Sequence, residues 1–280
     1  MRKKQIKWTV LTVSLCIITY SIIPISWMLR TSILEKSELM KFPADFFVKN
    51  ITLHNYKQIL GIGDVNILTS RNFYNALSNS VWSSFMATLI ITCVAILAGY
   101  VFARMKSKVT DMLFGFLLVT MVLPAYSVML PLYKMMLSLK LLDTVTGVVL
   151  IYVSAFMPLA IWIMKSFFET VPIDIEKSAW IDGASRFKAM CLILPLAAPG
   201  IIAAAIISFL SAWSQYAIPL VFASSKAQPL TVFLTTLSGK SSVNFGLISA
   251  GGAMTILPPL LIVVFLNRYL VSGLVKGAVK

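Results

Sequence analysis

The sequence predicts an all-α protein that crosses a membrane six times. The composition is 59% hydrophobic, only 12% of residues are charged, and the charges cluster between uncharged blocks. Soluble domains are usually about 45–50% apolar and about 25% charged, whereas a helix needs roughly 20 apolar residues to cross a ~30 Å hydrocarbon core. Six uncharged blocks reach that length, at residues 8–29, 72–103, 112–133, 144–164, 191–225 and 241–267.

The two longest of these blocks cannot be span along their whole length. The longest contains Pro195, Pro199 and Pro219, and proline disfavours helix in the residue before it; we predict a helix over 197–220 there. The polar sequence at 72–80 predicts that this stretch lies along the membrane surface before the span begins. The first block is longer than a signal-peptide core and no small-residue cleavage site follows it, so we expect a retained helix. The predicted single transmembrane domain, 1–280, has spans at 8–29, 81–103, 112–133, 144–164, 197–220 and 245–267 and an outer loop at 30–77.

The basic residues predict the orientation. Lys and Arg stay on the cytoplasmic side, and those in long loops count little. They cluster before the first span, at 104–108, in the segment 165–190 and after the last span, so we expect both termini to be cytoplasmic. The same residues, facing anionic lipid headgroups, account for the net charge of +14. No basic stripe with interleaved aromatics is visible, and we expect no nucleic-acid partner.

Motifs for chemistry are missing from the sequence. The text "SGKSS" at 238–242 resembles part of a phosphate-binding loop, but Leu234 stands where that motif needs a glycine. The three cysteines, Cys16, Cys93 and Cys191, fall in or at spans; we interpret them as apolar packing residues with no disulfide framework or metal site. We therefore expect a non-catalytic chain that binds no cofactor itself.

The charged segment 165–190 stands out between two uncharged spans. Its text "VPIDIEKSAWIDG" predicts a short helix, with Asp174 and Glu176 near the positive helix end and Gly183 in the left-handed conformation that ends a helix. Ser185 can cap a second helix. Trp180 and Ile181 are large apolar residues beside a turn that faces water, which is typical of a partner site. The alternative is a surface hairpin that only joins two spans.

This segment resembles the conserved cytoplasmic "EAA" loop of ATP-binding-cassette (ABC) importer permeases. The resemblance is to the second permease subunit of carbohydrate importers of the maltose, trehalose and glycerol-phosphate type, and it extends over nearly the whole chain. Further matching text follows the family's order: "ITLHNYKQIL", "LAGYVFARMKS", "LPLAAPGI", "FLSAWSQYAIPLVF" and "NRYLVSGLVKGAVK". The resemblance implies the type I permease fold of ABC importers and import of a di- or oligosaccharide, or a related polyol, across a bacterial cytoplasmic membrane.

The resemblance also implies partners. A second, homologous permease would complete a heterodimer, two copies of a cytoplasmic ABC ATPase would bind ATP and Mg²⁺, and an extracytoplasmic solute-binding protein would deliver the solute. The ATPase-coupling residues would be Asp174, Glu176, Lys177, Ala179, Trp180, Ile181, Asp182, Gly183 and Ala184.

The chain departs from the family pattern at three places. Lys177 occupies the usual position of the signature glutamate, and Ser178 replaces the first alanine. The stretch between Gly183 and Pro195 is one residue shorter than the resemblance implies. We expect a shifted register of the loop and an ATPase adapted to it. "WSQY" stands where relatives often have Trp-Asn-Glu or Trp-Asn-Asp, which leaves the substrate class open.

Residues at the end of the predicted fifth span are candidates for a substrate pathway. On a continuous helix, side chains four residues apart share a face, and an amide with neighbouring aromatic rings suits a sugar. The alternative is a glutamine that bonds another helix. The candidates are Ser211, Trp213, Gln215 and Tyr216.

Two other classes of function remain as alternatives. A secondary transporter or channel without an ATPase partner would usually place charges or unwound helices at the membrane midplane, and the six blocks indicate none. A membrane-bound enzyme would need a catalytic cluster near an interface, and the segment 165–190 holds the only dense group of acids and bases.

Overall fold

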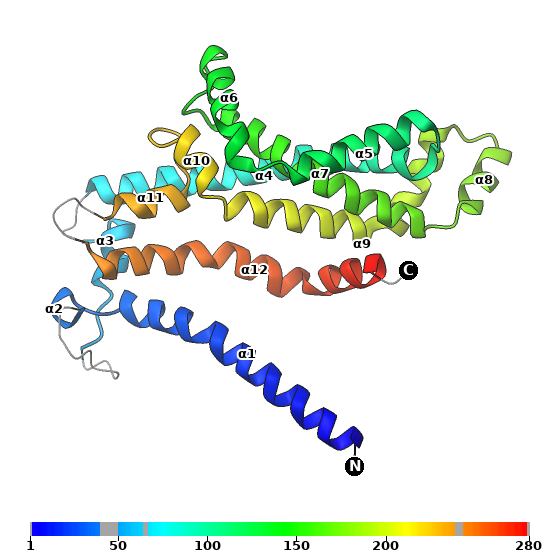
Figure 1. The fold of residues 1–280 in the computed structure, drawn as a ribbon. Helices are drawn as coiled ribbons and strands as arrows, with labels where there is room; N and C mark the ends of the chain where they lie inside the picture. The colour runs from blue at the N-terminus through cyan, green and yellow to red at the C-terminus, as the bar shows by residue number, and fades with distance from the viewer. Residues whose placement is uncertain (1, 40–49, 64–66, 239–242, 279–280) are drawn as a thin grey trace. The chain divides into compact units, whose positions relative to one another are not determined.

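The computed structural model describes residues 2–39, 50–63, 67–238 and 243–278. Parts of the predicted outer loop (40–49 and 64–66) and most of the "SGKSS" text (239–242) lie outside the described residues. Figure 1 shows the helices, which are α1 (Arg2–Ser32), α2 (Lys36–Leu39), α3 (His54–Leu60), α4 (Ile67–Arg104), α5 (Lys108–Val122), α6 (Ala125–Ser138), α7 (Val145–Thr170), α8 (Asp174–Ile181), α9 (Arg186–Trp213), α10 (Ala217–Phe222), α11 (Leu230–Thr236) and α12 (Phe245–Ala278).

The predicted class, an all-α polytopic membrane protein, is confirmed. Over the described residues the only β-type pairings are two isolated bridges, Leu34 with Ile51 and Ser238 with Val243. Five helices in this part of the chain are long and apolar enough to cross a membrane, namely α1, α4, α7, α9 and α12. The pair α5 and α6 counts as a sixth span if its two members, bent by 102°, are taken together.

Two elements differ from the predicted spans. The stretch 112–133 is broken where Leu123 is extended (φ −64°, ψ 131°) before Pro124, because a proline disfavours helix in the residue that precedes it. The helix predicted over 197–220 instead runs from Arg186, through Pro195 and Pro199, to Trp213. Prolines are tolerated inside membrane helices because neighbouring groups satisfy the freed carbonyls. Ser185 caps α9 as predicted, accepting a bond from the Lys188 N–H at 3.3 Å.

The chain divides into two compact units: Met1–Asn75 with Phe233–Leu257, and Ala76–Val232 with Pro258–Lys280. In the first unit, Asn55 of α3 is buried and donates its amide to the carbonyls of Ser32 and Leu34, both at 3.0 Å. Gly246 of α12 lies so close that a β-carbon there would stand 2.7 Å from the Asn55 amide nitrogen. The buried amide thus holds the end of α1, α3 and the start of α12 together.

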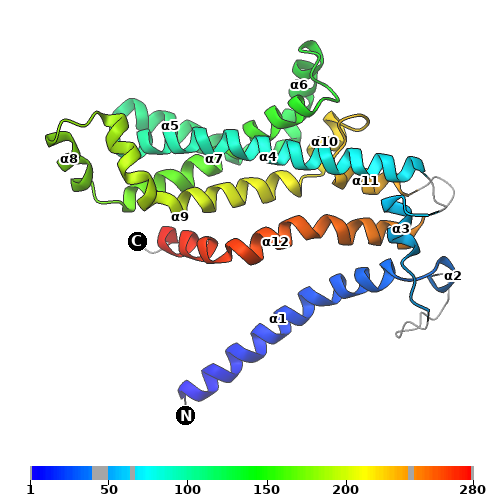
Figure 2. The same cartoon turned by 180° about the vertical axis from the view of Figure 1, so that it is seen from behind.

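The core of the second unit is the pair α7 and α9, which lie side by side in both views (Figures 1 and 2). Gly200 of α9 allows this approach, since a β-carbon there would overlap the Phe167 ring of α7. Gly99 of α4 has the same role: its β-carbon would stand 2.6 Å from that of Met164. Small residues at such positions let membrane helices approach closely, which replaces the missing hydrophobic drive with van der Waals contact.

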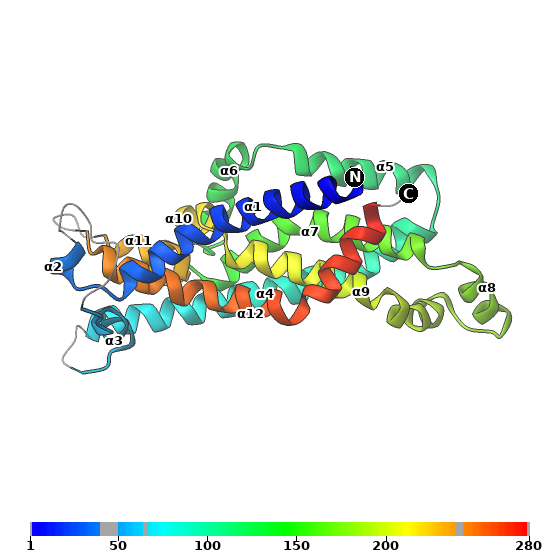
Figure 3. The same ribbon diagram turned by 90° about the horizontal axis from the view of Figure 1, so that it is seen from below.

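The short helices of this unit lie near its two ends. Seen from two directions, α8 stands beyond one end of α7 and α9, while α10 is near the opposite end (Figures 1 and 3). The predicted cytoplasmic segment and the predicted pathway residues are therefore separated by the length of the helix pair. Cys16, Cys93 and Cys191 are unbridged and exposed on this chain, so they do not pack within it.

Candidate functional site

Helix α8 ends in a tightly defined turn. Gly183 has φ +83°, as predicted from its position after the short helix. The Gly183 N–H donates to the Trp180 carbonyl at 3.0 Å, and the Ala184 N–H donates to the Ala179 carbonyl at 2.9 Å. These two bonds form a Schellman motif, which satisfies carbonyls at the end of a helix. The turn between α8 and α9 is thus rigid although it is exposed.

The turn presents apolar side chains outside the helix bundle. Ile181 is 86% exposed, and Phe187, in the first turn of α9, is 66% exposed. Phe187 was not among the predicted site residues. The available signal in the sequence was its position two residues after the predicted cap Ser185, which places it in the first turn of the next helix. Trp180 is half-buried, with the Arg186 guanidinium 5.7 Å from its ring centroid. Its ring therefore braces the turn and only part of it is accessible.

The charged residues of α8 divide between its two faces. Asp174 and Lys177 are exposed and form an ion pair at 2.9 Å, which is worth little in water. Asp182 is also exposed, whereas Ala179 and Ala184 are half-buried. Glu176 is different, because its side chain is fully buried. The predicted coupling residues therefore do not form one surface, and the Glu176 carboxylate faces the protein.

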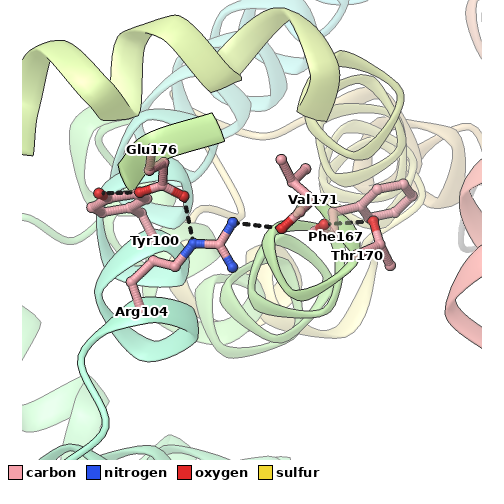
Figure 4. A network of polar contacts seen from close by, with 6 residues as sticks. All are labelled: Tyr100, Arg104, Phe167, Thr170, Val171 and Glu176. Carbon is pink, nitrogen blue, oxygen red and sulfur yellow. Dashed lines mark hydrogen bonds and ion pairs between the residues drawn. The ribbon is translucent and has the colours of Figure 1, made fainter. Parts of the chain in front are cut away.

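Figure 4 shows what holds Glu176. One carboxylate oxygen accepts the Tyr100 hydroxyl at 2.7 Å and the other accepts Arg104 Nε at 2.6 Å. Arg104 also donates from Nη2 to the carbonyl of Val171, the C-cap of α7, at 2.9 Å. The Arg104 side chain is only 7% exposed. Removing one member of such a buried pair typically costs about 3–5 kcal/mol, because the other charge is left uncompensated.

Tyr100 and Arg104 were not predicted as site residues. They are one helical turn apart at the end of α4, so they share a face, but they precede Glu176 by 76 and 72 residues. The sequence offered one signal, a single arginine closing the uncharged text "LAGYVFAR". As a basic residue at the end of a span, Arg104 indicates only topology in the sequence.

The second group of predicted residues lies at a break in a helix. α9 ends at Trp213 and α10 begins at Ala217, so Ser211 and Gln215 do not share a helix face, contrary to the prediction. Pro219 explains the break: a continuous helix would need its missing N–H to bond the Gln215 carbonyl. That carbonyl instead accepts the Thr231 hydroxyl at 2.7 Å.

A cavity of about 360 Å³ opens beside this break. Gln215 lines it, while Ser211, Trp213 and Tyr216 do not. Trp213 is 4% exposed and stacks on Phe209 with ring centroids 5.7 Å apart, so it is a packing residue; Tyr216 is exposed elsewhere. The polar lining side chains are Thr120 of α5, Ser154 of α7 and Gln215 in the break, and the others are apolar. The lining residues are Thr120, Met121, Leu123, Val128, Met129, Leu132, Ile151, Ser154, Ala155, Phe156, Pro158, Gln215, Ile218 and Phe222.

The loop after α10 is held by a carboxylate from the turn between α6 and α7. Asp143 accepts the N–H groups of Ser225, Lys226 and Ala227 at 3.2, 2.8 and 3.1 Å. Its own N–H donates to the Phe222 carbonyl at 2.8 Å. A carboxylate that accepts several backbone N–H groups makes charge-assisted bonds, which are stronger than neutral ones.

The same loop is held from α4. The Asn79 amide donates to the carbonyls of Lys226 and Gln228 at 2.9 and 3.1 Å. The Ser80 hydroxyl accepts the Leu230 N–H at 2.8 Å. Within the described residues, no group of three or more His, Cys, Asp or Glu side chains is placed to hold a metal ion.

Comparison with known proteins identifies the family. Residues 91–276 match the family model described as "Binding-protein-dependent transport system inner membrane component". The trehalose transport system permease protein SugB of Mycobacterium tuberculosis is 31% identical over 98% of this chain and 97% of its own. The sulfoquinovosyl glycerol transport system permease protein SmoH of Agrobacterium fabrum is 30% identical over 92% of this chain and 88% of its own.

A solved structure shares the fold. The crystal structure of a bacterial ABC transporter involved in the import of the acidic polysaccharide alginate contains a chain that superposes with a TM-score of 0.79, covering 96% of this chain and 98% of that one at 19% identity. The likeness agrees with the predicted permease fold. The chain therefore belongs to the family of binding-protein-dependent transport system inner membrane components, the permease subunits of ABC importers.

Proposed function

We propose that this chain is one of two homologous permeases of a carbohydrate importer and that it forms half of the translocation pathway. The observation that carries the proposal is the rigid turn after α8, which holds Ile181 and Phe187 exposed beyond the helix bundle. Such a feature suits docking into a groove of a partner. Relatives whose names specify trehalose, trehalose/maltose and diacetylchitobiose support a di- or oligosaccharide as the solute.

The partner at this turn would be a cytoplasmic ABC ATPase, present in two copies, that binds ATP and Mg²⁺. Clustered Lys and Arg support a cytoplasmic location for α8 and for both termini. This chain would hydrolyse nothing; its work would be to convert movement of α8 into opening of the pathway. An extracytoplasmic solute-binding protein would deliver the sugar to the end of the helix pair where α10 lies.

The cavity beside α10 is the part of the chain that we propose meets the solute. Its mixture of an apolar wall with a few polar groups is typical of ligand pockets, which usually measure about 300–1,000 Å³. Gln215 and Ser154 offer an amide and a hydroxyl to sugar hydroxyls. A helix break at such a cavity is common in transporters, because unwound backbone is tolerated where it lines a cavity.

Reconstitution would test the proposal. The chain, its partner permease and the ATPase encoded with them are purified together and placed in proteoliposomes with the binding protein on the outer side. We expect copurification of the ATPase and ATP-dependent accumulation of a radiolabelled disaccharide. Accumulation that needs only an ion gradient, or a complex that forms without any ATPase, would overturn the proposal.

A further inference from the structure

We propose that α4 is the rod that carries the movement of α8 to the extracytoplasmic loop after α10, with Arg104 and Asn79 as the positioning residues at its two ends. The inference rests on the proposed coupling of α8 to an ATPase. It adds a route: α8 is joined covalently only to α7 and α9, yet side chains bind it to a third helix.

The first step is the attachment of α8 to α4. Both oxygens of the Glu176 carboxylate are held from successive turns of α4, by Tyr100 at 2.7 Å and by Arg104 at 2.6 Å. The carboxylate is fully buried, so water cannot replace either bond while α8 moves. A tilt of α8 away from α4 would strand two buried charges, which is strongly unfavourable. The two helices therefore move together.

The end of α7 is attached to the same end of α4. Arg104 caps α7 through the Val171 carbonyl at 2.9 Å. The Tyr100 ring meets the Phe168 ring edge-on with centroids 5.6 Å apart, and Gly99 brings the two backbones together. Charge, aromatic contact and close backbone approach thus lock the cytoplasmic end of α4 to α8 and to the end of α7.

The second step is the rod itself. α4 runs without interruption from Ile67 to Arg104, and no proline lies within it to bend it. From Asn79 to Arg104 the axial rise is about 38 Å at 1.5 Å per residue. That length is enough to cross the hydrocarbon core. Because the helix is continuous, a displacement of one end also displaces the other end.

The third step is the attachment at the far end. Asn79 and Ser80 bind the loop after α10 through Lys226, Gln228 and Leu230 at 2.8–3.1 Å. This loop follows directly on α10, whose residues Ile218 and Phe222 line the cavity. A shift of α4 would therefore pull on the segment that borders the proposed solute site.

The experiment measures movement at one end in response to nucleotide at the other. Ser224 is exposed and makes none of the loop's anchoring contacts, so it is replaced by cysteine in a chain lacking Cys16, Cys93 and Cys191. The full complex with its ATPase is reconstituted in nanodiscs. The rate of labelling at position 224 by an impermeant thiol reagent is compared with and without ATP plus vanadate. We expect nucleotide to change this rate at least fivefold.

Variants at both ends test the route. Glu176→Gln and Arg104→Gln should bind the ATPase and hydrolyse ATP, but the nucleotide response at position 224 should fall below twofold. Asn79→Ala should do the same without disturbing any buried charge. The matched control is Glu169→Gln, which removes the partly exposed ion pair with Lys165 on α7; it should keep the full response.

Each outcome decides the inference. If a single charge variant does not accumulate, the double variant Glu176→Gln/Arg104→Gln leaves no unpaired charge and takes its place. A full response at position 224 in this variant or in Asn79→Ala overturns the inference. The inference is also overturned if nucleotide does not change the labelling rate at position 224 in the complex without these variants while that complex transports solute. Failure of the wild-type chain to bind the ATPase would instead overturn the proposed function.

Discussion

Gly183 provides a quantitative test of the docking turn, because its substitution strains the backbone without a clash inside the chain. A β-carbon at this position would meet no heavy atom within 4 Å, so no side chain would clash. The φ of +83° nevertheless lies in the left-handed region, which costs an ordinary L-residue roughly 1–2 kcal/mol. We therefore examine Gly183→Val, with Gly183→Asn as the tolerant replacement.

The expected loss of affinity follows from that conformational cost. A penalty of about 1–2 kcal/mol lowers the ratio of correctly folded to incorrectly folded turn by a factor of about 5–30. The apparent Kd for the ATPase rises by as much as this factor, because only the competent conformation binds. Asparagine visits the left-handed region readily, so Gly183→Asn should weaken binding far less.

The assay is titration of the purified ATPase onto the permease pair held in nanodiscs, read by biolayer interferometry. Gly115→Ala is the matched control, since Gly115 also has open space around it but lies within α5 and has no positive φ. It should bind the ATPase as wild type does. Equal affinity for Gly183→Val and wild type, or equal losses for the valine and asparagine variants, would refute the reasoning.

Four further predictions concern the pathway, the core and the orientation. Gln215→Leu should assemble normally but change the uptake rate or the order of preferred sugars in competition assays; unchanged preference would make the residue structural. Trp213→Ala should instead lower stability by about 3–5 kcal/mol, as loss of a buried aromatic ring does, seen as a drop in Tm of the detergent-solubilised chain. Gly200→Val should overpack the α7–α9 contact by about 1–3 kcal/mol, with the same readout. In a cysteine-free chain, an impermeant reagent applied to intact cells should label cysteine at Asn50 but not at Lys177, and the reverse would invert the topology.

Local rules predicted the features that depend on neighbours in sequence. Gly183 and Ser185 could be assigned as a helix end and a helix cap because both roles follow from a few adjacent residues. The spans were visible because an apolar run of about 20 residues has few other uses. The boundaries of the spans differ from the prediction where a helix tolerates a proline, as at Pro199. The groups that satisfy the freed carbonyl there are distant in the sequence, so neighbouring residues do not reveal them.

The site depended more on distant contacts. Glu176 reads as an exposed acid in a short amphipathic helix, and only the arrival of α4 makes it buried. The break at Gln215 could be predicted from the sequence, because Pro219 lacks the N–H that would bond the Gln215 carbonyl in a continuous helix. The rule applies to Gln215, four positions before Pro219, and it contradicts a continuous helix over 197–220.

The carboxylate of Asp143 has a consequence for the biogenesis of this protein. Its three amide partners lie 82 to 84 residues further along the chain. At about 5–20 residues per second of synthesis, Asp143 is synthesised roughly 4–17 s before those amides. In that interval α7, α8, α9 and α10 are synthesised. The bonds that Asp143 makes can therefore form only after both long helices, α7 and α9, have been synthesised, which makes closure of the loop a late event in assembly.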